Sequence, residues 1–327
     1  MLKEKKVLVT GGAGYIGSVL VGLLLDKGYK VKVLDRLMFG GEAVLNYLNN
    51  PDFEFHKGDI RNINDLKNAM KGVDAVAHLA SIVGDPACAK DKQLTKSTNL
   101  DGAKLVYNIA NEYGVKQFVF SSTCSNYGKM SDANSYVTED SELAPVSLYA
   151  ETKVKFEKYL LEQSKDNICK PTILRFSTVY GLSQRPRFDL TVNEFTKELA
   201  LGRELVIFGE QFWRPYCHVV DLARAVITVI ESDIKKVEFE VFNVGDTNEN
   251  YTKKMLVHEI VKQIPNSKVK YVKKDEDPRD YRVNFDKIKD KLNFRITKTV
   301  PEGISQIKKV IQDGFFVNPD EPKYKNI

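Results

Sequence analysis

The sequence predicts an α/β protein, with a doubly wound parallel sheet of the Rossmann type and a smaller, partly interleaved C-terminal domain. Three observations support this fold class. Strand-like and helix-like segments alternate through the first half of the chain, which is typical of a parallel sheet covered on both faces. A cluster of glycines separates the first strand from the first helix. After Tyr180-Gly181 the predicted segments become shorter and irregular, which indicates a second domain.

The predicted elements follow in order along the chain. Strands are expected at residues 6–10, 30–34, 53–56, 75–79 and 117–121, with helices at 15–26, 42–48, 63–70 and 94–113. A helix at 147–164 and a strand at 172–176 continue the sheet. Beyond residue 180 we expect helices at 191–201, 221–232 and 252–264, and strands at 205–208 and 238–244. The last strand should return to the large sheet. The first domain is therefore assigned to residues 1–180, with a returning segment near 205–250, and the second mostly to 181–327. The polar tail, 318–327, is expected to be mobile.

Composition limits the classes of function. The chain has 327 residues and a net charge of +5, without a focused basic run, so a nucleic-acid partner is not expected. No apolar run approaches the about 20 residues of a membrane span, and the first strand begins too early for a preceding signal peptide. The four cysteines are scattered along the chain, which is typical of free thiols in a reducing compartment. The histidines are also dispersed, so a metal site is not expected. We therefore expect a cytoplasmic protein with no membrane partner.

The glycine cluster predicts a dinucleotide-binding turn. Gly11, Gly14 and Gly17 follow the strand at 6–10 and open the helix at 15–26. Glycines let the backbone approach a pyrophosphate, and the N–H groups of the helix then face its oxygens. The second strand ends in Asp35, which can accept hydrogen bonds from an adenosine ribose and would repel a 2′-phosphate. NAD is therefore favoured, although the adjacent Arg36 leaves NADP as an alternative.

A second group of residues predicts alcohol oxidation. Thr123 follows a strand end, and Tyr149 and Lys153 lie four residues apart, on one face of the helix at 147–164. A phenol has a pKa near about 10, so it needs help to act as a base at neutral pH. We expect the Lys153 ammonium and a positive nicotinamide to lower that pKa. The phenolate would take the proton of a substrate alcohol while hydride leaves the same carbon, and Thr123 would hold the substrate oxygen.

These motifs together resemble the extended short-chain dehydrogenase/reductases of the nucleotide-sugar epimerase/dehydratase family. The resemblance spans about residues 5–311. It rests on Gly11-Gly12-Ala13-Gly14-Tyr15-Ile16-Gly17, Gly58-Asp59-Ile60, His78-Leu79-Ala80, Ser121-Ser122-Thr123 with Tyr127-Gly128, and Tyr149 with Lys153. It implies bound NAD, a nucleoside-diphosphate sugar substrate and a homodimer. By the same resemblance, Asp59 and Ile60 would contact the adenine, and Asn99 would lie on a helix behind the site. The remaining implied cofactor-site residues are Tyr15, Ile16, Leu79, Ala80, Ser81, Ser121 and Phe176.

The chain departs from the family pattern at several positions. Cys124 and Ser125 stand where dehydratases of the family carry an Asp-Glu pair, which argues against 4,6-dehydration. Thr178 replaces an Asn before Val179-Tyr180-Gly181, so its substrate contact is in doubt. Arginines hold phosphate through a two-pronged hydrogen bond. The candidates for substrate binding are Thr123, Thr178, Arg187, Asn193, Arg214 and Arg279.

The sequence therefore favours an NAD-dependent nucleotide-sugar epimerase that oxidises sugar C4 to a 4-keto intermediate. The main alternative is a C4 dehydrogenase or ketoreductase, because Arg187-Phe188-Asp189-Leu190 and the segment after Asp277 loosely resemble a branch that oxidises GDP-heptoses. A 4,6-dehydratase or a non-catalytic NAD-binding regulator is a weaker hypothesis. A regulator would have no use for an intact Thr123, Tyr149 and Lys153.

Overall fold

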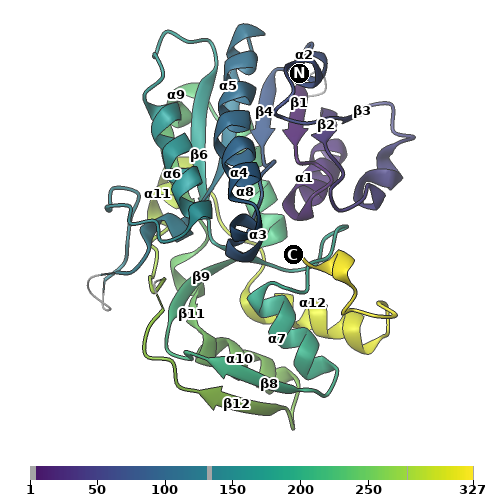
Figure 1. The fold of residues 1–327 in the computed structure, drawn as a ribbon, viewed down its shortest axis with the longest axis vertical. Coiled ribbons are helices and arrows are strands. Elements are labelled where there is room, and N and C mark those ends of the chain that lie inside the picture. Colours follow the sequence, from purple (N-terminus) through teal and green to yellow (C-terminus); the bar gives the residue numbers. More distant parts are fainter. Residues whose placement is uncertain (1–4, 131–134, 278, 327) are drawn as a thin grey trace.

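A seven-stranded parallel sheet forms the upper lobe of the molecule (Figure 1). The computed structural model describes residues 5–130, 135–277 and 279–326. The strand order is β10-β6-β5-β4-β1-β2-β3. Their bounds are β1 Lys6–Thr10, β2 Lys30–Asp35, β3 Phe53–Lys57, β4 Ala75–His78, β5 Gln117–Thr123, β6 Lys170–Phe176 and β10 Glu240–Val244. The predicted doubly wound fold is confirmed, and the carboxyl ends of all these strands meet at one edge, where such folds bind ligands.

Helices cover both faces of the sheet. Helices α1 (Tyr15–Asp26) and α8 (Val219–Glu231) pack on one face, and α2 (Ile63–Met70), α5 (Ala103–Glu112) and α6 (Leu148–Leu161) on the other. Alternate residues of β1 enter the two cores: Val7 and Val9 join one, whereas Leu8 joins the other. Burial on both faces explains why the central strands β1 and β4 are largely apolar, whereas the edge strand β3 has exposed Glu54 and Lys57.

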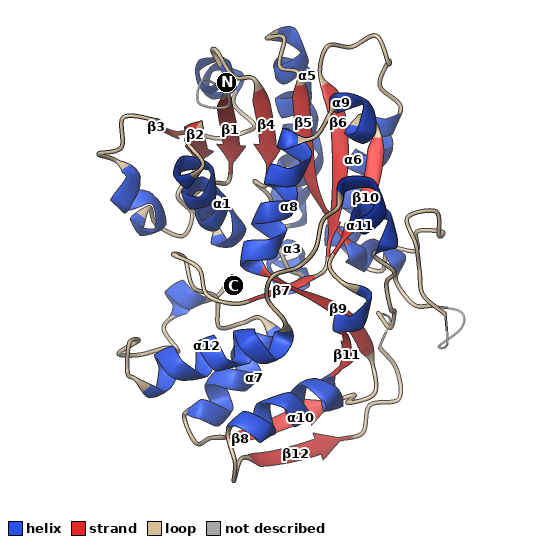
Figure 2. Cartoon of the chain, turned by 180° about the vertical axis from the view of Figure 1, so that it is seen from behind, coloured by secondary structure: helices blue, strands red, loops and turns tan. Residues whose placement is uncertain are grey.

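The lower lobe is built after β6 (Figure 2). Helices α7 (Thr191–Ala200), α10 (Lys253–Gln263) and α12 (Val300–Gln312) enclose its core. A three-stranded sheet contains β7 (Thr178–Tyr180), β9 (Trp213–His218) and β11 (Asn250–Thr252), and a two-stranded sheet contains β8 (Glu204–Phe208) and β12 (Lys268–Val272). Between β9 and β11 the chain returns to the upper lobe, where it forms α8, the short helix α9 (Ile234–Val237) and β10. Strand β10 pairs with β6. Helix α11 (Asp286–Leu292) also packs beside β10.

The helix predicted at 94–113 is confirmed as a helical segment over residues 92–112, but a π-helical turn interrupts its regular α-helical geometry. Helix α3 (Asp85–Lys90) and helix α4 (Lys92–Lys96) lead into a π-helical turn, η3 (Ser97–Gly102), before α5 begins. The Asn99 side chain accepts a hydrogen bond from the Ile82 N–H at 2.7 Å and donates one to the Ile82 carbonyl at 2.9 Å. The helix widens where Asn99 serves the neighbouring loop, and such π turns are common at functional sites. The helix predicted at 42–48 is also not a regular α-helix, because residues 42–47 form a 3₁₀ helix, η2 (Glu42–Tyr47).

The C-terminal tail is ordered, contrary to the mobility that its polar composition predicts. The Tyr324 ring packs on Phe188 at 5.6 Å and on Phe316 at 5.4 Å between ring centres. The Phe188 N–H donates to the Tyr324 carbonyl at 2.9 Å. Asp320 pairs with Lys197 at 2.6 Å and with Arg203 at 2.7 Å. The tail therefore runs back over the lower lobe, and both views place its end between the two lobes.

The described residues contain neither a candidate membrane span nor a candidate metal cluster. Within 5–130, 135–277 and 279–326, no helix is both long and apolar enough to cross a membrane. Across those same ranges, no three His, Cys, Asp or Glu side chains gather as they would around a metal ion.

Candidate active site

The glycine turn lies between β1 and α1 and leaves the first turn of the helix open. Gly11 has φ +76°, and a Cβ there would meet the Ala80 backbone nitrogen at 2.8 Å. A Cβ on Gly17 would overlap the Gly11 carbonyl. Helix α1 begins after Gly14 without a side-chain cap and without an acidic residue in its first turn. These features fit a diphosphate, because only backbone N–H groups occupy the positive end of the helix.

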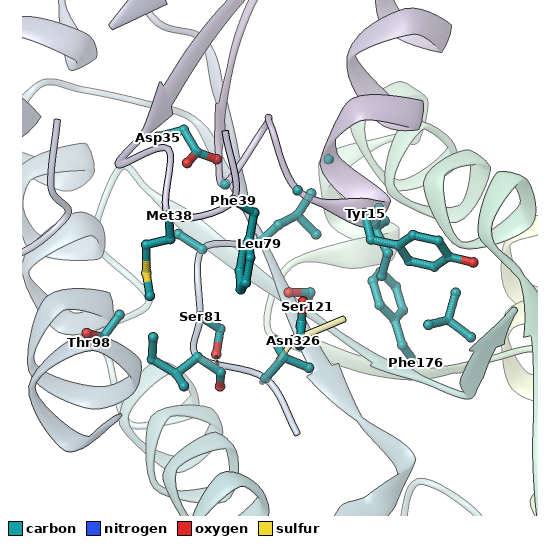
Figure 3. Close-up of a pocket in the computed structure, with 18 of the residues that line it drawn as sticks. Tyr15, Asp35, Met38, Phe39, Leu79, Ser81, Thr98, Ser121, Phe176 and Asn326 are labelled. Atoms are coloured by element: carbon teal, nitrogen blue, oxygen red, sulfur yellow. Dashed lines mark hydrogen bonds between the residues drawn. The ribbon is translucent and has the colours of Figure 1, made fainter. Parts of the chain in front are cut away.

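A pocket opens above this turn, at the carboxyl edge of the sheet (Figure 3). It brings together most of the cofactor-site residues predicted from the sequence. Those that line it are Gly11, Gly14, Tyr15, Ile16, Gly17, Asp35, Ile60, Leu79, Ala80, Ser81, Ser121, Tyr149, Lys153 and Phe176. Asp59 and Asn99 are not among its lining residues.

The acidic residues near the predicted ribose end differ in their partners. Asp35 lines the pocket and accepts backbone hydrogen bonds from Ala13 at 3.0 Å and Leu37 at 2.8 Å. Burial outweighs these bonds and raises the pKa of Asp35. Asp59 instead pairs with Arg61 at 2.7 Å and with Arg36 at 3.2 Å. Although burial opposes it, this pairing lowers the pKa of Asp59. Arg36 is thereby held by a carboxylate, so its suitability for a 2′-phosphate is reduced.

The three residues predicted to carry the chemistry all line the same pocket. Thr123 ends β5, and its hydroxyl accepts the Ser125 N–H at 3.1 Å, which opens the 3₁₀ turn η4 (Cys124–Tyr127). Tyr149 lies in the first turn of α6, which Ser147 caps. The Lys153 ammonium donates to the Ser121 carbonyl at 2.7 Å and lies 5.7 Å from the centre of the Tyr149 ring. The glycine turn and the tyrosine-lysine pair therefore share one cavity.

Burial dominates the electrostatics of this pair in the protein by itself. Burial lowers the pKa of Lys153 to about 7. Although the Tyr149 side chain is partly open to solvent, desolvation by the surrounding protein raises the pKa of its phenol. The lowering expected from the sequence invoked Lys153 together with a positive nicotinamide, so it stays a prediction for the cofactor-bound protein. Desolvation disfavours both charged forms and outweighs their mutual stabilisation in the protein by itself.

A buried polar network supports the strand that carries Thr123. Glu157, one turn beyond Lys153 on α6, accepts hydrogen bonds from Arg175 at 2.8 Å and Asn126 at 2.8 Å, and from the Ser122 hydroxyl. Arg175 also donates to the Tyr127 hydroxyl at 2.9 Å. The network joins α6, β5, β6 and η4, so it fixes the end of β5 relative to the helix that carries Tyr149.

Cys124 is embedded beside this network. Its side chain is buried, and its thiol donates to the Arg175 carbonyl at 3.2 Å. Burial raises the pKa of the Cys124 thiol well above its usual value. A thiolate nucleophile is therefore disfavoured at this position.

The substrate-binding candidates are distributed unevenly around the pocket. Thr123 and Arg187 line it, whereas Thr178, Asn193, Arg214 and Arg279 do not. Arg187 is buried and pairs with Asp189 at 2.7 Å. The buried Asn193 amide bonds to the backbone of Gly181 and Arg187 and to the Tyr15 hydroxyl. Asn193 thus shapes the loop that begins at Gly181, and its side chain is fully engaged within the protein.

The two remaining arginines are held by acids. Arg214 pairs with Asp277 at 3.0 Å, and both side chains are largely buried. Arg279 pairs with Asp85 at 2.9 Å, and this pair is more exposed. Asp85 opens α3 in the upper lobe, whereas Arg279 follows β12 of the lower lobe. The second pair therefore links the two lobes.

Several lining residues were not predicted from the sequence. Arg185 and Asn326 line the pocket, and so do Met38 and Phe39 of the loop after Asp35, for which the sequence left open a cover over the cofactor or a simple connection. Arg185 belongs to the arginine-containing segment 184–190, which offered a signal, but only Arg187 was selected from it. Asn326 lies at the far end of the chain, and no local pattern connects it with a pocket at the glycine turn.

Comparison with known proteins places this site in a family. The family model "NAD dependent epimerase/dehydratase family" matches residues 7–245. A UDP-glucose 4-epimerase of Bacillus subtilis is 30% identical over 85% of this chain and 88% of its own length. The structure of the Thermotoga maritima UDP-glucose 4-epimerase with UDP-glucose superposes with a TM-score of 0.83 at 28% identity, covering 95% of this chain and 100% of that one.

A second solved structure carries both a substrate and a cofactor. The Bacillus cereus UDP-glucuronic acid 4-epimerase, in complex with UDP-glucuronic acid and NAD, has a TM-score of 0.83 at 26% identity, covering 94% and 99% of the two chains. With the family model matching well over half of the sequence, and with the glycine turn and the tyrosine-lysine pair in one pocket, the chain belongs to the NAD-dependent epimerase/dehydratase family.

Proposed function

We propose that this protein is an NAD-dependent nucleotide-sugar epimerase that acts through oxidation at sugar C4. The observation that carries the proposal is the meeting of Thr123, Tyr149 and Lys153 with the glycine turn in a single pocket. Relatives named as UDP-sugar 4-epimerases support a UDP-sugar as the first substrate to test. A nucleoside-diphosphate sugar would have its reacting carbon beside Tyr149 and its diphosphate toward the lower lobe.

Tyr149, Lys153 and Thr123 have different roles in the transfer of the C4 hydroxyl proton. The Tyr149 phenolate receives the proton of the C4 hydroxyl, and the phenol so formed returns it after the sugar has turned over in the site. Lys153 stabilises the phenolate, and Thr123 holds the substrate oxygen. When bound, NAD supplies reversible hydride exchange, so the sugar is oxidised and then reduced without net redox change. A positively charged nicotinamide also opposes the desolvation that raises the pKa of Tyr149.

The structure disfavours dehydration as the net reaction. A 4,6-dehydratase must deliver one proton to the leaving C6 hydroxyl and remove another from C5. Cys124 is buried with a raised pKa, and Ser125 is a hydroxyl whose nearest side-chain partner is Tyr281 at 3.4 Å. Neither side chain offers an acid-base group at neutral pH, so the 4-keto sugar has no route to water loss here.

The diphosphate of the substrate is assigned to the arginines around the lower half of the cleft. Arg214 and Arg279 are already paired with Asp277 and Asp85, and Arg187 with Asp189. Each must share or exchange its carboxylate partner when a diphosphate binds. Thr178, like Arg214 and Arg279, lies outside the residues that line the pocket; it is the weaker candidate because it carries no positive charge. The homodimer likewise stays a prediction.

The proposal is tested by incubating the purified protein with UDP-, GDP- and dTDP-hexoses without added cofactor. We expect NAD to be released when the protein is denatured, and one of the nucleotide sugars to be converted to its C4 epimer. Stoichiometric NADH, or an accumulating 4-keto sugar, would instead indicate the C4 dehydrogenase or ketoreductase. Absence of any conversion with NAD bound would leave only the regulator hypothesis.

A further inference from the structure

The Arg185 side chain reaches into the cofactor pocket and is only 6% exposed. One terminal nitrogen, Nη1, donates to the Asn326 side-chain oxygen at 2.5 Å, and Nη2 donates to the Lys325 carbonyl at 3.0 Å. The remaining donor, Nε, is buried and has no hydrogen-bond partner. Buried donors are almost always satisfied, so an unpartnered Nε in a ligand pocket indicates a place for an acceptor.

The charge of Arg185 is only partly balanced, because Asp189 and Asp35 act on it from beyond ion-pair distance. Among the residues that the structure describes, no carboxylate lies within 4.0 Å of its guanidinium nitrogens, although many other arginines of the chain have such a partner. Burial, and then the neighbouring Arg187, lower the pKa of Arg185 to about 10. A buried cation without a partner is costly. An anionic ligand would remove that cost.

The loop that carries Arg185 is fastened to the first turn of α1. The Tyr15 hydroxyl donates to the Gly181 carbonyl at 2.5 Å, and the Ser183 hydroxyl donates to the Tyr15 carbonyl at 2.7 Å. Ser183 also contacts the Ser18 hydroxyl at 3.0 Å. Arg185 follows two residues later, so its position is fixed relative to the open end of the helix.

The other side of the guanidinium faces the segment that follows Asp35. Its central carbon lies 3.9 Å from the centre of the Phe39 ring, and Figure 3 shows Phe39, Asp35 and Asn326 around the same hollow. Arg185 thus bridges the helix end, where a diphosphate is expected, and Asp35, where the adenosine ribose is expected. A 2′-phosphate is disfavoured as its partner, because the Asp35 carboxylate would stand beside it.

We propose that Arg185 is a cofactor-binding residue that holds the diphosphate of NAD from the side opposite α1, and that the C-terminal residues Lys325 and Asn326 clamp it there. The inference rests on the proposed NAD-dependent function and deepens it. Helix α1 offers backbone N–H groups from one side, and Arg185 offers a guanidinium from the other. The tail closes over the guanidinium, so it slows the release of the cofactor between turnovers.

The test is calorimetric titration of the NAD-free protein with NAD, ADP and adenosine. In Arg185→Gln we expect the dissociation constants of NAD and ADP to rise about 10- to 100-fold, because a charge-assisted hydrogen bond is lost. Adenosine, which lacks phosphate, should bind within about 2-fold of wild type. Arg185→Lys should recover part of the loss. The matched control is Arg295→Gln, an exposed arginine outside the pocket, and it should bind all three ligands normally.

Three outcomes would overturn the assignment. Unchanged NAD and ADP affinities would show that Arg185 does not reach the diphosphate. An equal loss for adenosine would show that the substitution distorts the pocket. In a parallel titration with NADP, a loss confined to that ligand would place a 2′-phosphate at Arg185. Near-ultraviolet circular dichroism checks the fold of Arg185→Gln. If Arg185→Gln does not fold, the affinities of Arg185→Lys for NAD, ADP and adenosine are compared with those of wild type instead.

The clamp itself is tested by the rate of NAD release. Asn326→Ala should release NAD about 2- to 5-fold faster, because one hydrogen bond to the guanidinium is removed. An unchanged rate would remove the tail from the proposal. These binding readouts are independent of turnover. A protein that does not epimerise sugars can still show the Arg185 pattern, whereas an active epimerase with normal NAD binding in Arg185→Gln would refute this inference alone.

Discussion

Two pairs of cations, Arg185 with Lys153 and Arg214 with Arg279, differ in their partners. In the cofactor half, Arg185 and Lys153 are buried, and among the described residues neither has a carboxylate within 4.0 Å. Toward the substrate side, Arg214 and Arg279 are paired with Asp277 and Asp85. Burial correspondingly lowers the pKa of Arg185 to about 10 and that of Lys153 to about 7.

The difference separates two ways of receiving a diphosphate. In the cofactor half, within the part of the chain that the structure describes, Arg185 and Lys153 form no ion pair that a dinucleotide would have to break, and Arg185 Nε still lacks a hydrogen-bond partner. The substrate side must give up or share carboxylate contacts before its arginines can hold phosphate. We therefore expect tight, lasting binding in the first half and weaker, exchangeable binding in the second, which suits a retained cofactor and a substrate that turns over.

The largest effect should come from Tyr149, the group that Lys153 faces. Tyr149→Phe should reduce turnover at least about 100-fold, because the proton-transferring hydroxyl is lost. NAD binding should stay within about 2-fold, since the glycine turn and Arg185 are unchanged. Steady-state kinetics and calorimetric titration with NAD measure the two quantities. Near-normal turnover of this variant would remove Tyr149 from the mechanism.

The Arg214–Asp277 ion pair can be removed by substituting either residue. Arg214→Gln should weaken UDP binding about 10-fold through the loss of a charge-assisted contact. Asp277→Asn should tighten UDP binding about 3-fold or more, because the competing carboxylate is removed and Arg214 is freed. Titration with UDP at low salt measures both variants. Weaker binding in Asp277→Asn would mean that Asp277 positions Arg214 for the ligand and does not compete with it.

The uncompensated charge of Lys153 should appear in the pH dependence of stability. Its pKa is about 7 in the folded chain and about 10.4 when unfolded, so folding releases a proton between these values. Stability should therefore rise as the pH increases from 7 to 9.5. The melting temperature of wild type should gain about 2–5 °C more over this range than that of Lys153→Met. Parallel pH curves for the two proteins would contradict the lowered pKa.

The smallest effect is expected at the link between the lobes. Arg279 and Asp85 form a pair whose side chains are 37% and 36% exposed, and exposed pairs contribute about 0–1 kcal/mol. Asp85→Asn should change the free energy of unfolding by no more than about 1 kcal/mol and the apparent KM by about 2-fold. Urea unfolding and kinetics measure these quantities. A large loss of stability would show that the pair holds the lobes together.

Local sequence patterns were sufficient for the cofactor half of the fold. The strand, glycines, helix and Asp35 follow one another within 35 residues, and each is a signal at fixed spacing. Tyr149 and Lys153 are readable for the same reason, since four residues on a helix place them together. The edge strand β10 was recognised from its apolar run, and its pairing with β6 is confirmed.

The remaining features depend on contacts between distant segments. Asn326 meets Arg185 across 141 positions of the chain, and the Glu157–Arg175 pair joins a helix to a strand. Strand β9 was missed because Trp213-Arg214-Pro215 shows no alternation of apolar and polar residues. Helix α12 was also missed, although Thr299 and Glu302 form a capping box, which is a sequence signal for the N-terminus of a helix. The desolvation that raises the pKa of Tyr149 in the protein by itself also depends on distant segments, and no local pattern reports it.

The proposed reaction is tested most directly by following the hydrogen on C4 of the sugar. Whichever nucleotide sugar the protein accepts is prepared with deuterium at C4 and incubated in ordinary water without added NAD. If the hydrogen removed from C4 is held in the pocket and returned to the same carbon, the nuclear magnetic resonance spectrum will show the epimer with its deuterium retained. Replacement of that deuterium by hydrogen from water, or its transfer to released NADH, would contradict the account.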